Sequence, residues 1–184
     1  MTPEEVKGVQ SRARLLHPKA EVEAVLDRMA DEIREEMEGL CPILMCIMHG
    51  GLITTAGLAS RLSFPLQFDY LHATRYRENT SGADLQWRVR PSLDLADRVV
   101  LLIADIFDEG HTLKQVRDHC FKENCRKVYS AVLIDKQHDR KVQDFAVDFV
   151  GLSVEDFYLY GYGMDYKGFL RNAPGIYAID ESDK

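Results

Sequence analysis

The sequence predicts an α/β fold in which a central parallel sheet is flanked by helices. Three short apolar runs carry this prediction, because each reads as a strand buried on both faces: residues 42–48, 99–104 and 128–134. Helical stretches separate these runs, and strands joined by helices form right-handed crossovers in a parallel sheet. Ligands of such sheets bind beyond the carboxyl ends of the strands, so the loops after each run are expected to carry the chemistry.

Composition limits the classes of protein that the chain can represent. Its 184 residues, of which 46% are hydrophobic and 29% charged, fit one domain spanning residues 1–184. The net charge of −7 argues against a nucleic-acid partner, and no apolar run approaches the ~20 residues of a membrane helix. The N-terminus lacks the pattern of a secretory signal, and the four cysteines form no C-x-x-C motif. A cytoplasmic protein without a membrane partner is expected.

The first half of the chain predicts two helices and two strands. Apolar residues recur at helical spacing from Val22 to Met37, and Gly39 ends that helix. The strand at residues 42–48 is broken by His49-Gly50-Gly51, and a small-residue helix follows to about Ser60. Residues 64–74 alternate enough to predict a second strand.

The segment at residues 75–91 differs in character, because it is polar and has no sustained apolar period. A loop of this length inside a compact domain is typical of a functional lid or a disordered segment. After it the sequence predicts a strand at residues 99–104, a helix at 112–122 and a strand at 128–134. Short strands separated by turns are expected at residues 148–152, 157–163 and 175–180.

The most informative loop follows the strand at residues 99–104. It places Asp105 and Asp108 before Gly110-His111-Thr112, which opens the next helix. Backbone N–H groups at a helix start, with glycine for close approach and a threonine hydroxyl, form an anion site. Carboxylates beside such a site suit ribose hydroxyls, a metal or a proton, but Asp108 is equally explained as a helix cap. The motif alone favours neither the ligand-binding role of these carboxylates nor the helix-capping role of Asp108.

Residues 105–113 resemble the phosphoribosyl-pyrophosphate motif of type I phosphoribosyltransferases. The remaining loops narrow the resemblance to the hypoxanthine-guanine branch, especially to bacterial members with the same Glu-Gly-His-Thr wording. The match spans about residues 42–179. It implies a parallel sheet flanked by helices, a small hood built from the N-terminal segment and residues 155–184, and a flexible lid at residues 75–90.

The resemblance also implies a role for each matching residue. The lid would begin at Arg75 and Tyr76, and Asp108 would be the catalytic group near N7 of the purine. The family pattern assigns 5′-phosphate and ribose binding to Asp105, Asp108, Glu109, Gly110, His111 and Thr112. It assigns pyrophosphate binding to His49, Gly50 and Arg171, purine binding to Lys136, Tyr158, Leu159 and Asp165, and Mg²⁺ to Asp105 and Asp165. One position departs from the family, since Ala104 stands where an acidic residue is usual.

The expected activity is Mg²⁺-dependent transfer of phosphoribosyl from 5-phosphoribosyl 1-pyrophosphate to hypoxanthine or guanine in purine salvage. The alternative is a regulator of the same fold that senses nucleotides with weak or no catalysis. Without the family context, Lys136 would be read as an ordinary solvated lysine and the aromatic cluster around Tyr158 as core. The resemblance further implies a homodimer or homotetramer.

Overall fold

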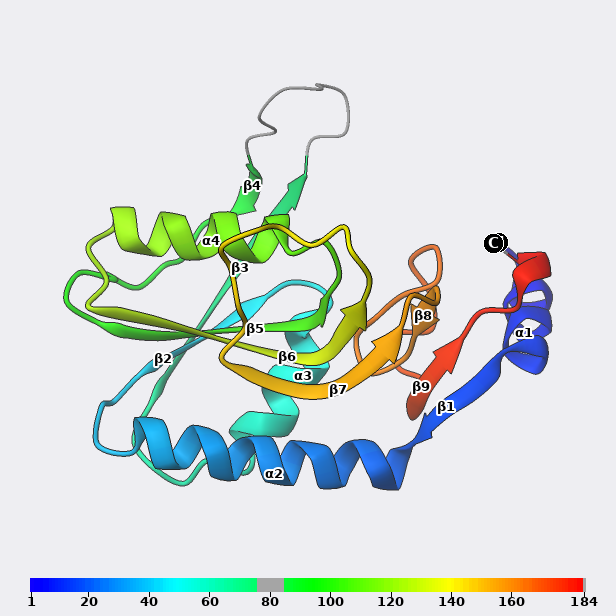
Figure 1. The fold of residues 1–184 in the computed structure, drawn as a ribbon, viewed down its shortest axis with the longest axis horizontal. Helices are drawn as coiled ribbons and strands as arrows, with labels where there is room; N and C mark the ends of the chain where they lie inside the picture. Colours follow the sequence, from blue (N-terminus) through cyan, green and yellow to red (C-terminus); the bar gives the residue numbers. More distant parts are fainter. Residues whose placement is uncertain (76–84, 184) are drawn as a thin grey trace.

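A computed structural model describes residues 1–75 and 85–183, and its centre is a six-stranded sheet (Figure 1). All neighbouring strands are parallel except β4, which runs antiparallel to β3 at one edge. In spatial order the strands are β4 (Leu85–Val89), β3 (Gln67–Arg75), β2 (Ile43–Ile47), β5 (Val99–Phe107), β6 (Lys127–Gln137) and β7 (Phe149–Glu155). The predicted fold class is confirmed.

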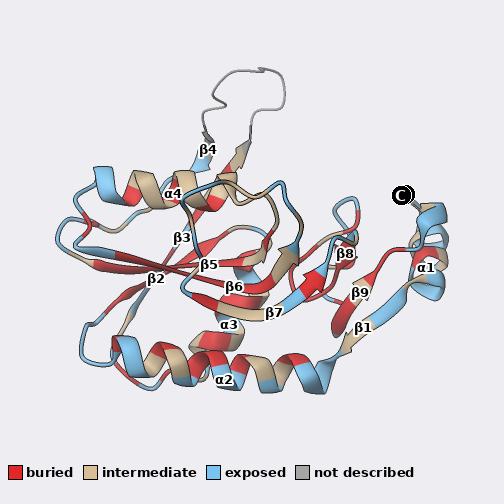
Figure 2. Cartoon of the chain, viewed as in Figure 1, coloured by how far each residue is buried: buried red, intermediate tan, exposed pale blue. Residues whose placement is uncertain are grey.

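Helices cover both faces of this sheet. α2 (Lys19–Met37) and α3 (Gly51–Ala59) lie on one face, and α4 (His111–Lys122) lies on the other (Figure 1). As a result, β2 and most of β5 are buried between these layers of helices (Figure 2). In the described part of the chain, no helix is long and apolar enough to cross a membrane.

A second, three-stranded antiparallel sheet joins the two ends of the chain. It consists of β1 (Arg14–Pro18), β9 (Gly175–Ala178) and β8 (Leu159–Tyr160), in that order. α1 (Pro3–Arg12) and a 3₁₀ helix at Glu181–Asp183 lie beside it, held together by an ion pair of 2.6 Å from Arg12 to Asp183. This sheet lies beyond the carboxyl ends of the parallel strands (Figure 1).

The prediction of a continuous loop at residues 75–90 is wrong at both of its ends. β3 extends to Arg75, and Leu85–Val89 forms the edge strand β4. The sequence signal for β4 is a short alternation of apolar and polar residues, in which Trp87 faces inward. The centre of the Trp87 ring lies 4.6 Å from that of His119 on α4. Residues 76–84 of the predicted lid, including Tyr76, lie outside the described residues.

Two further differences lie in the small sheet and in the helix beside it. No element is predicted at α1, although its Thr2-Pro3-Glu4-Glu5 start forms a capping box. The Thr2 hydroxyl accepts the N–H of Glu5, and the Glu5 carboxylate accepts the N–H of Thr2. The strand predicted at residues 157–163 is reduced to Leu159–Tyr160. Positive φ angles at 161, 162 and 163 turn the chain there.

A buried carboxylate fastens β3 to the segment after β4. Asp69 is 8% exposed and accepts hydrogen bonds from the backbone N–H groups of Tyr70, Ser92 and Leu93 and from the Ser92 hydroxyl. Burial alone would raise the pKa of Asp69, but these donors bind the charged form and lower it. The edge of the sheet is therefore held by charge-assisted hydrogen bonds.

Candidate active site

The loops after β2 and β5 meet in a cavity of about 690 Å³ at the carboxyl edge of the large sheet. Side chains from β3, from β4 and from the turn before β9 complete its wall. Of the residues singled out from the sequence, the cavity is lined by His49, Gly50, Asp105, Asp108, Glu109, Gly110, His111, Thr112 and Arg171. Parallel pairing of β2 with β5 brings these loops together from distant parts of the chain.

The first turn of α4 lines this cavity, and a helix leaves the first backbone N–H groups without partners inside the helix. Gly110 caps the helix with a φ of +83°, and no side chain caps the first turn. A φ of this sign favours glycine, and a Cβ at this position would lie 2.2 Å from the Phe107 ring. Since the turn contains no acidic residue, it suits an anion. The interpretation of Asp108 as a helix cap is wrong.

Gly50 and Asp105 lie close together in the wall of the cavity. A Cβ at Gly50 would lie 2.0 Å from Oδ2 of Asp105, so only glycine fits beside this carboxylate. Asp105 accepts the N–H of Ile106 at 3.0 Å. Burial raises the pKa of Asp105 to about 6, although backbone N–H groups and the charge of Arg171 act in the opposite direction.

Arg171 connects the cavity to the turn that carries Asp165. One guanidinium nitrogen donates to the carbonyl of Gly163 at 2.5 Å, and another lies 2.6 Å from Oδ1 of Asp165. Oδ2 of Asp165 accepts the N–H of Gly168 at 2.7 Å. Asp165 therefore orients Arg171 from outside the cavity wall.

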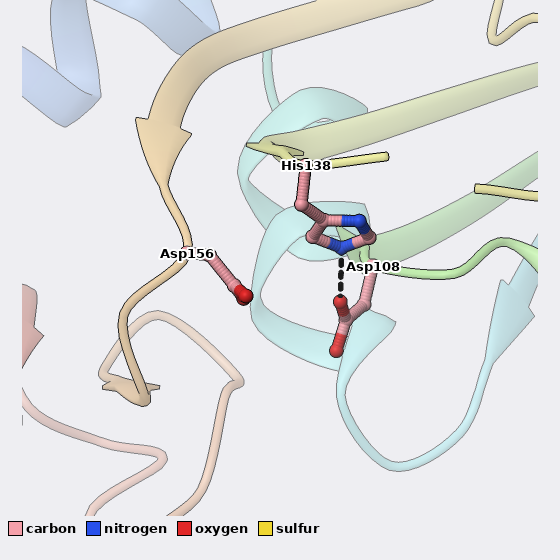
Figure 3. Close-up of side chains that lie close together, drawn as sticks. All are labelled: Asp108, His138 and Asp156. Atoms are coloured by element: carbon pink, nitrogen blue, oxygen red, sulfur yellow. Dashed lines mark hydrogen bonds and ion pairs between the residues drawn. The ribbon is translucent and has the colours of Figure 1, made fainter. Parts of the chain in front are cut away.

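Asp108 belongs to a charged cluster at the ends of β5, β6 and β7 (Figure 3). Its Oδ1 lies 2.7 Å from Nε2 of His138, and its Oδ2 lies 3.6 Å from Nζ of Lys136. Nζ of Lys136 also donates to Asp156 at 3.1 Å, and Arg140 donates to the other oxygen of Asp156 at 2.7 Å. Only 11% of the Lys136 side chain is exposed, so the interpretation as a solvated lysine is wrong.

The remaining predicted residues lie away from the cavity wall. Leu159 is buried in β8, whereas Tyr158 is 37% exposed with its ring centre 5.6 Å from that of Tyr166. Arg75 ends β3, and Tyr76 is not among the described residues. The structure thus brings the residues of two loops together and leaves the aromatic segment at the margin.

Three residues that line the cavity or belong to the charged cluster are not predicted from the sequence. His72 on β3 and Arg88 on β4 line the cavity, and the rings of His72 and His49 are 4.4 Å apart. Burial, followed by the charges of His49, Arg88 and Arg171, lowers the pKa of His72. The alternation of β4 could have pointed to Arg88, but nothing in the sequence marks His138, because its partner Asp108 comes from another strand.

Two sets of side chains have the composition of a metal site. Asp105 and Asp165 offer oxygen ligands of the kind that Mg²⁺ prefers, with substrate oxygens and water completing its shell. Burial disfavours the charged form of Asp105, and a bound cation would stabilise that form, so a cation fits there. Asp165 already pairs with Arg171 and would have to contribute beside that pair. Asp108, His138 and Asp156 also place ligand atoms within 4.8 Å of one another. In that cluster the ammonium group of Lys136 already pairs with both carboxylates.

Comparison with known proteins identifies the family. The family described as "Phosphoribosyl transferase domain" matches residues 14–167. The chain belongs to the phosphoribosyltransferase family. The resemblance noted in the sequence is thereby confirmed, and the match includes both loops of the cavity and the turn with Asp165.

Relatives of the family match more than nine tenths of the chain. The hypoxanthine-guanine-xanthine phosphoribosyltransferase of Tritrichomonas foetus is 28% identical over 92% of this chain and 92% of its own. The hypoxanthine-guanine phosphoribosyltransferase of Aquifex aeolicus is 27% identical over 96% of this chain and 99% of its own. A solved hypoxanthine phosphoribosyltransferase from Staphylococcus aureus superimposes with a TM-score of 0.88 at 20% identity, covering 99% of this chain and 97% of that one. That likeness shows the shared fold.

We expect Asp105→Asn to stabilise the free protein at pH 7.5 and to leave its stability unchanged near pH 4. An aspartate in the unfolded chain titrates near pH ~3.9, whereas burial raises the pKa of Asp105 to about 6 in the fold. Between these values the unfolded state has lost a proton that the folded state keeps, so wild-type stability falls as the pH rises. Urea unfolding in EDTA between pH 4 and 8 measures this difference.

Asp69→Asn is the matched control, because the pKa of Asp69 is lowered whereas that of Asp105 is raised. The lowered pKa of Asp69 contributes stability above the unfolded value, and this contribution is lost as the pH falls through the folded pKa. The control variant should therefore be less stable than wild type at pH 7.5, by about 2 kcal/mol. An Asp105→Asn protein that is also less stable at pH 7.5 would contradict the effect of burial on Asp105.

Proposed function

We propose that the protein transfers phosphoribosyl from 5-phosphoribosyl 1-pyrophosphate to hypoxanthine or guanine, giving IMP or GMP and pyrophosphate in purine salvage. The observation that carries this proposal is that one cavity contains both the uncapped N-terminus of α4 and Asp108, whose oxygens are held by Lys136 and His138. The first feature suits a sugar phosphate and the second suits a polar base. The names of the relatives support the same reaction.

The sugar phosphate and the leaving group are proposed to occupy different ends of the cavity. The 5′-phosphate accepts backbone N–H groups from Glu109, Gly110, His111 and Thr112, and Asp105 accepts ribose hydroxyls. Pyrophosphate binds against the loop of His49 and Gly50 and against Arg171. Arg88, which lines the same wall, adds positive charge to this subsite, whereas the lowered pKa of His72 favours its neutral imidazole.

Mg²⁺ is proposed to bind at Asp105 and Asp165 together with oxygens of the diphosphate. When bound, the ion would neutralise charge on the departing pyrophosphate. Ala104 cannot share this task, because a methyl group offers neither a ligand nor a hydrogen-bond acceptor. The chain's own contribution is the guanidinium of Arg171, which Asp165 and Gly163 fix in place.

The base is proposed to lie between the charged cluster and the aromatic segment. Lys136 donates to the 6-oxo group, Tyr158 stacks on the ring, and Leu159 and Asp165 lie along its edge. Asp108 accepts the proton from N7 as the new bond to the sugar forms. This arrangement prefers bases with an acceptor at C6, since an ammonium group has only donors.

Titration with 5-phosphoribosyl 1-pyrophosphate and Mg²⁺, followed by an absorbance assay with hypoxanthine, tests the proposal. Binding with turnover supports the transferase. Binding of nucleotides without turnover would instead indicate the regulator that the sequence left as an alternative.

Asp108→Asn should lower kcat about 10²–10⁴-fold, because the amide keeps the shape of the carboxylate but cannot accept the N7 proton. The KM for 5-phosphoribosyl 1-pyrophosphate should change much less. Steady-state kinetics measure both values. Asp118→Asn is the matched control, since Asp118 is also paired with a lysine, at 2.9 Å, but lies on α4 away from the cavity. Wild-type turnover of Asp108→Asn would falsify the assignment.

Lys136→Met should raise the KM for hypoxanthine more than the KM for 5-phosphoribosyl 1-pyrophosphate, because it removes the ammonium group but keeps the stem. The wild type should use adenine on the order of 10⁴-fold less efficiently than hypoxanthine. The amino group of adenine is a hydrogen-bond donor and would face the ammonium of Lys136, which is also a donor. Lys127→Met is the control, because Lys127 is 54% exposed and paired with Glu36. Efficient use of adenine by the wild type would show that Lys136 does not select the base.

We further propose that the protein forms a homodimer or homotetramer in the cytoplasm, where its four free thiols would stay reduced. An apolar hollow on α3 and β3 supports the assembly, because Leu52, Phe68 and Tyr70 are each about half exposed there.

Phe68→Asp should dissociate this assembly toward the monomer mass of 21.0 kDa, as measured by light scattering. Phe121→Asp, an equally drastic change at an exposed phenylalanine of α4, should leave the mass unchanged. Equal dissociation by both variants, or by neither, would place the interface elsewhere.

A further inference from the structure

We infer that His138 is a positioning residue for Asp108, and that it acts as a hydrogen-bond donor in one fixed tautomer. This inference rests on the proposed role of Asp108 at N7 of the purine. His138 follows the end of β6, its side chain is 5% exposed, and its Nε2 lies 2.7 Å from Oδ1 of Asp108 (Figure 3). His138 is not among the residues to which the family resemblance assigns a role.

The tautomer follows from the second ring nitrogen. The backbone N–H of Arg140 donates to Nδ1 of His138 at 3.1 Å, so Nδ1 must present a lone pair. A neutral imidazole with an acceptor at Nδ1 carries its proton on Nε2. Nε2 therefore donates to Oδ1 of Asp108, and the carboxylate receives a charge-assisted hydrogen bond.

This bond determines which oxygen of Asp108 faces the substrate. Among the described residues, Oδ1 pairs with His138 at 2.7 Å and Oδ2 pairs with Lys136 at 3.6 Å, so Oδ2 is the less tightly held oxygen and the one that we assign to the N7 proton. His138 cannot accept that proton itself, because an N–H at Nδ1 would point at the N–H of Arg140. The proton from the base thus goes to Asp108, and His138 fixes where it goes.

A metal ion bound by Asp108, His138 and Asp156 is the competing interpretation of the same geometry. It requires a lone pair on Nε2, whereas the bond from Arg140 places a proton there. It also requires room for a second cation beside Lys136, which already pairs with Asp108 and Asp156, and beside Arg140, which donates to Asp156. The observations therefore favour the donor.

The tautomer can be measured without any enzyme assay. Nitrogen-15 NMR of the histidine side chains should show His138 as a neutral ring protonated at Nε2, with the signal assigned by its loss in His138→Leu. A ring protonated at Nδ1, an imidazolium, or a shift of the His138 signal on addition of Zn²⁺ or Mg²⁺ alone would overturn the inference.

Kinetics test whether the bond matters. His138→Leu should lower kcat roughly 10- to 100-fold, the equivalent of one charge-assisted hydrogen bond, with little change in the KM for 5-phosphoribosyl 1-pyrophosphate. His138→Gln, which can place an N–H near the position of Nε2, should recover most of the loss. His17→Leu is the matched control, because His17 also contacts a carboxylate, Glu21 at 2.8 Å, but on β1. Equal activity of the Leu and Gln variants at position 138 would overturn the role.

The double variant separates this inference from the proposed function. If His138 acts through Asp108, His138→Leu should have no further effect on kcat in the Asp108→Asn background. Additive losses would show that His138 acts by another route. A fully active Asp108→Asn protein would instead refute the role of Asp108, while the NMR result for the tautomer would stand by itself.

Discussion

The contact on which the site depends is the approach of the Gly50 backbone to the carboxylate of Asp105. Parallel pairing of β2 with β5 places the loop after β2 beside Asp105, which lies on the last part of β5, and the absence of a side chain at Gly50 allows their close approach. On its other side the Gly50 carbonyl faces Gly163, where a Cβ would lie 2.0 Å away. Three distant segments therefore meet at one point, and any side chain there would separate them.

This crowding has an electrostatic consequence that a comparison of two aspartates makes clear. Asp69 is surrounded by donors, and its pKa is lowered, so its charge stabilises the fold. Asp105 has fewer hydrogen-bond donors, and burial raises its pKa to about 6. A carboxylate held in this way is costly to the empty protein and favourable only when a ligand satisfies it, which is typical of binding sites rather than of structural ones.

The sequence predicted the parts of the molecule that depend on local patterns. Uninterrupted apolar runs located β2, β5 and β6, and the glycine-containing loops after β2 and β5 located the cavity. It missed β4, whose alternation is too short to stand out from a polar segment. It also missed His138, because the bond to Asp108 joins the ends of two strands and leaves no trace in the spacing of residues. Tertiary pairing of this kind requires the fold to be known.

The order of strands in the small sheet also affects how the chain can fold during its synthesis. β1 forms the edge of that sheet and pairs only with β9, which lies near the other end of the described chain. Until the ribosome has released residues 175–178, β1 has no partner strand, whereas the strands of the large sheet through β7 are already complete. The large sheet can therefore form on the nascent chain, and closure of the small sheet comes last because its contacts span the greatest sequence separation.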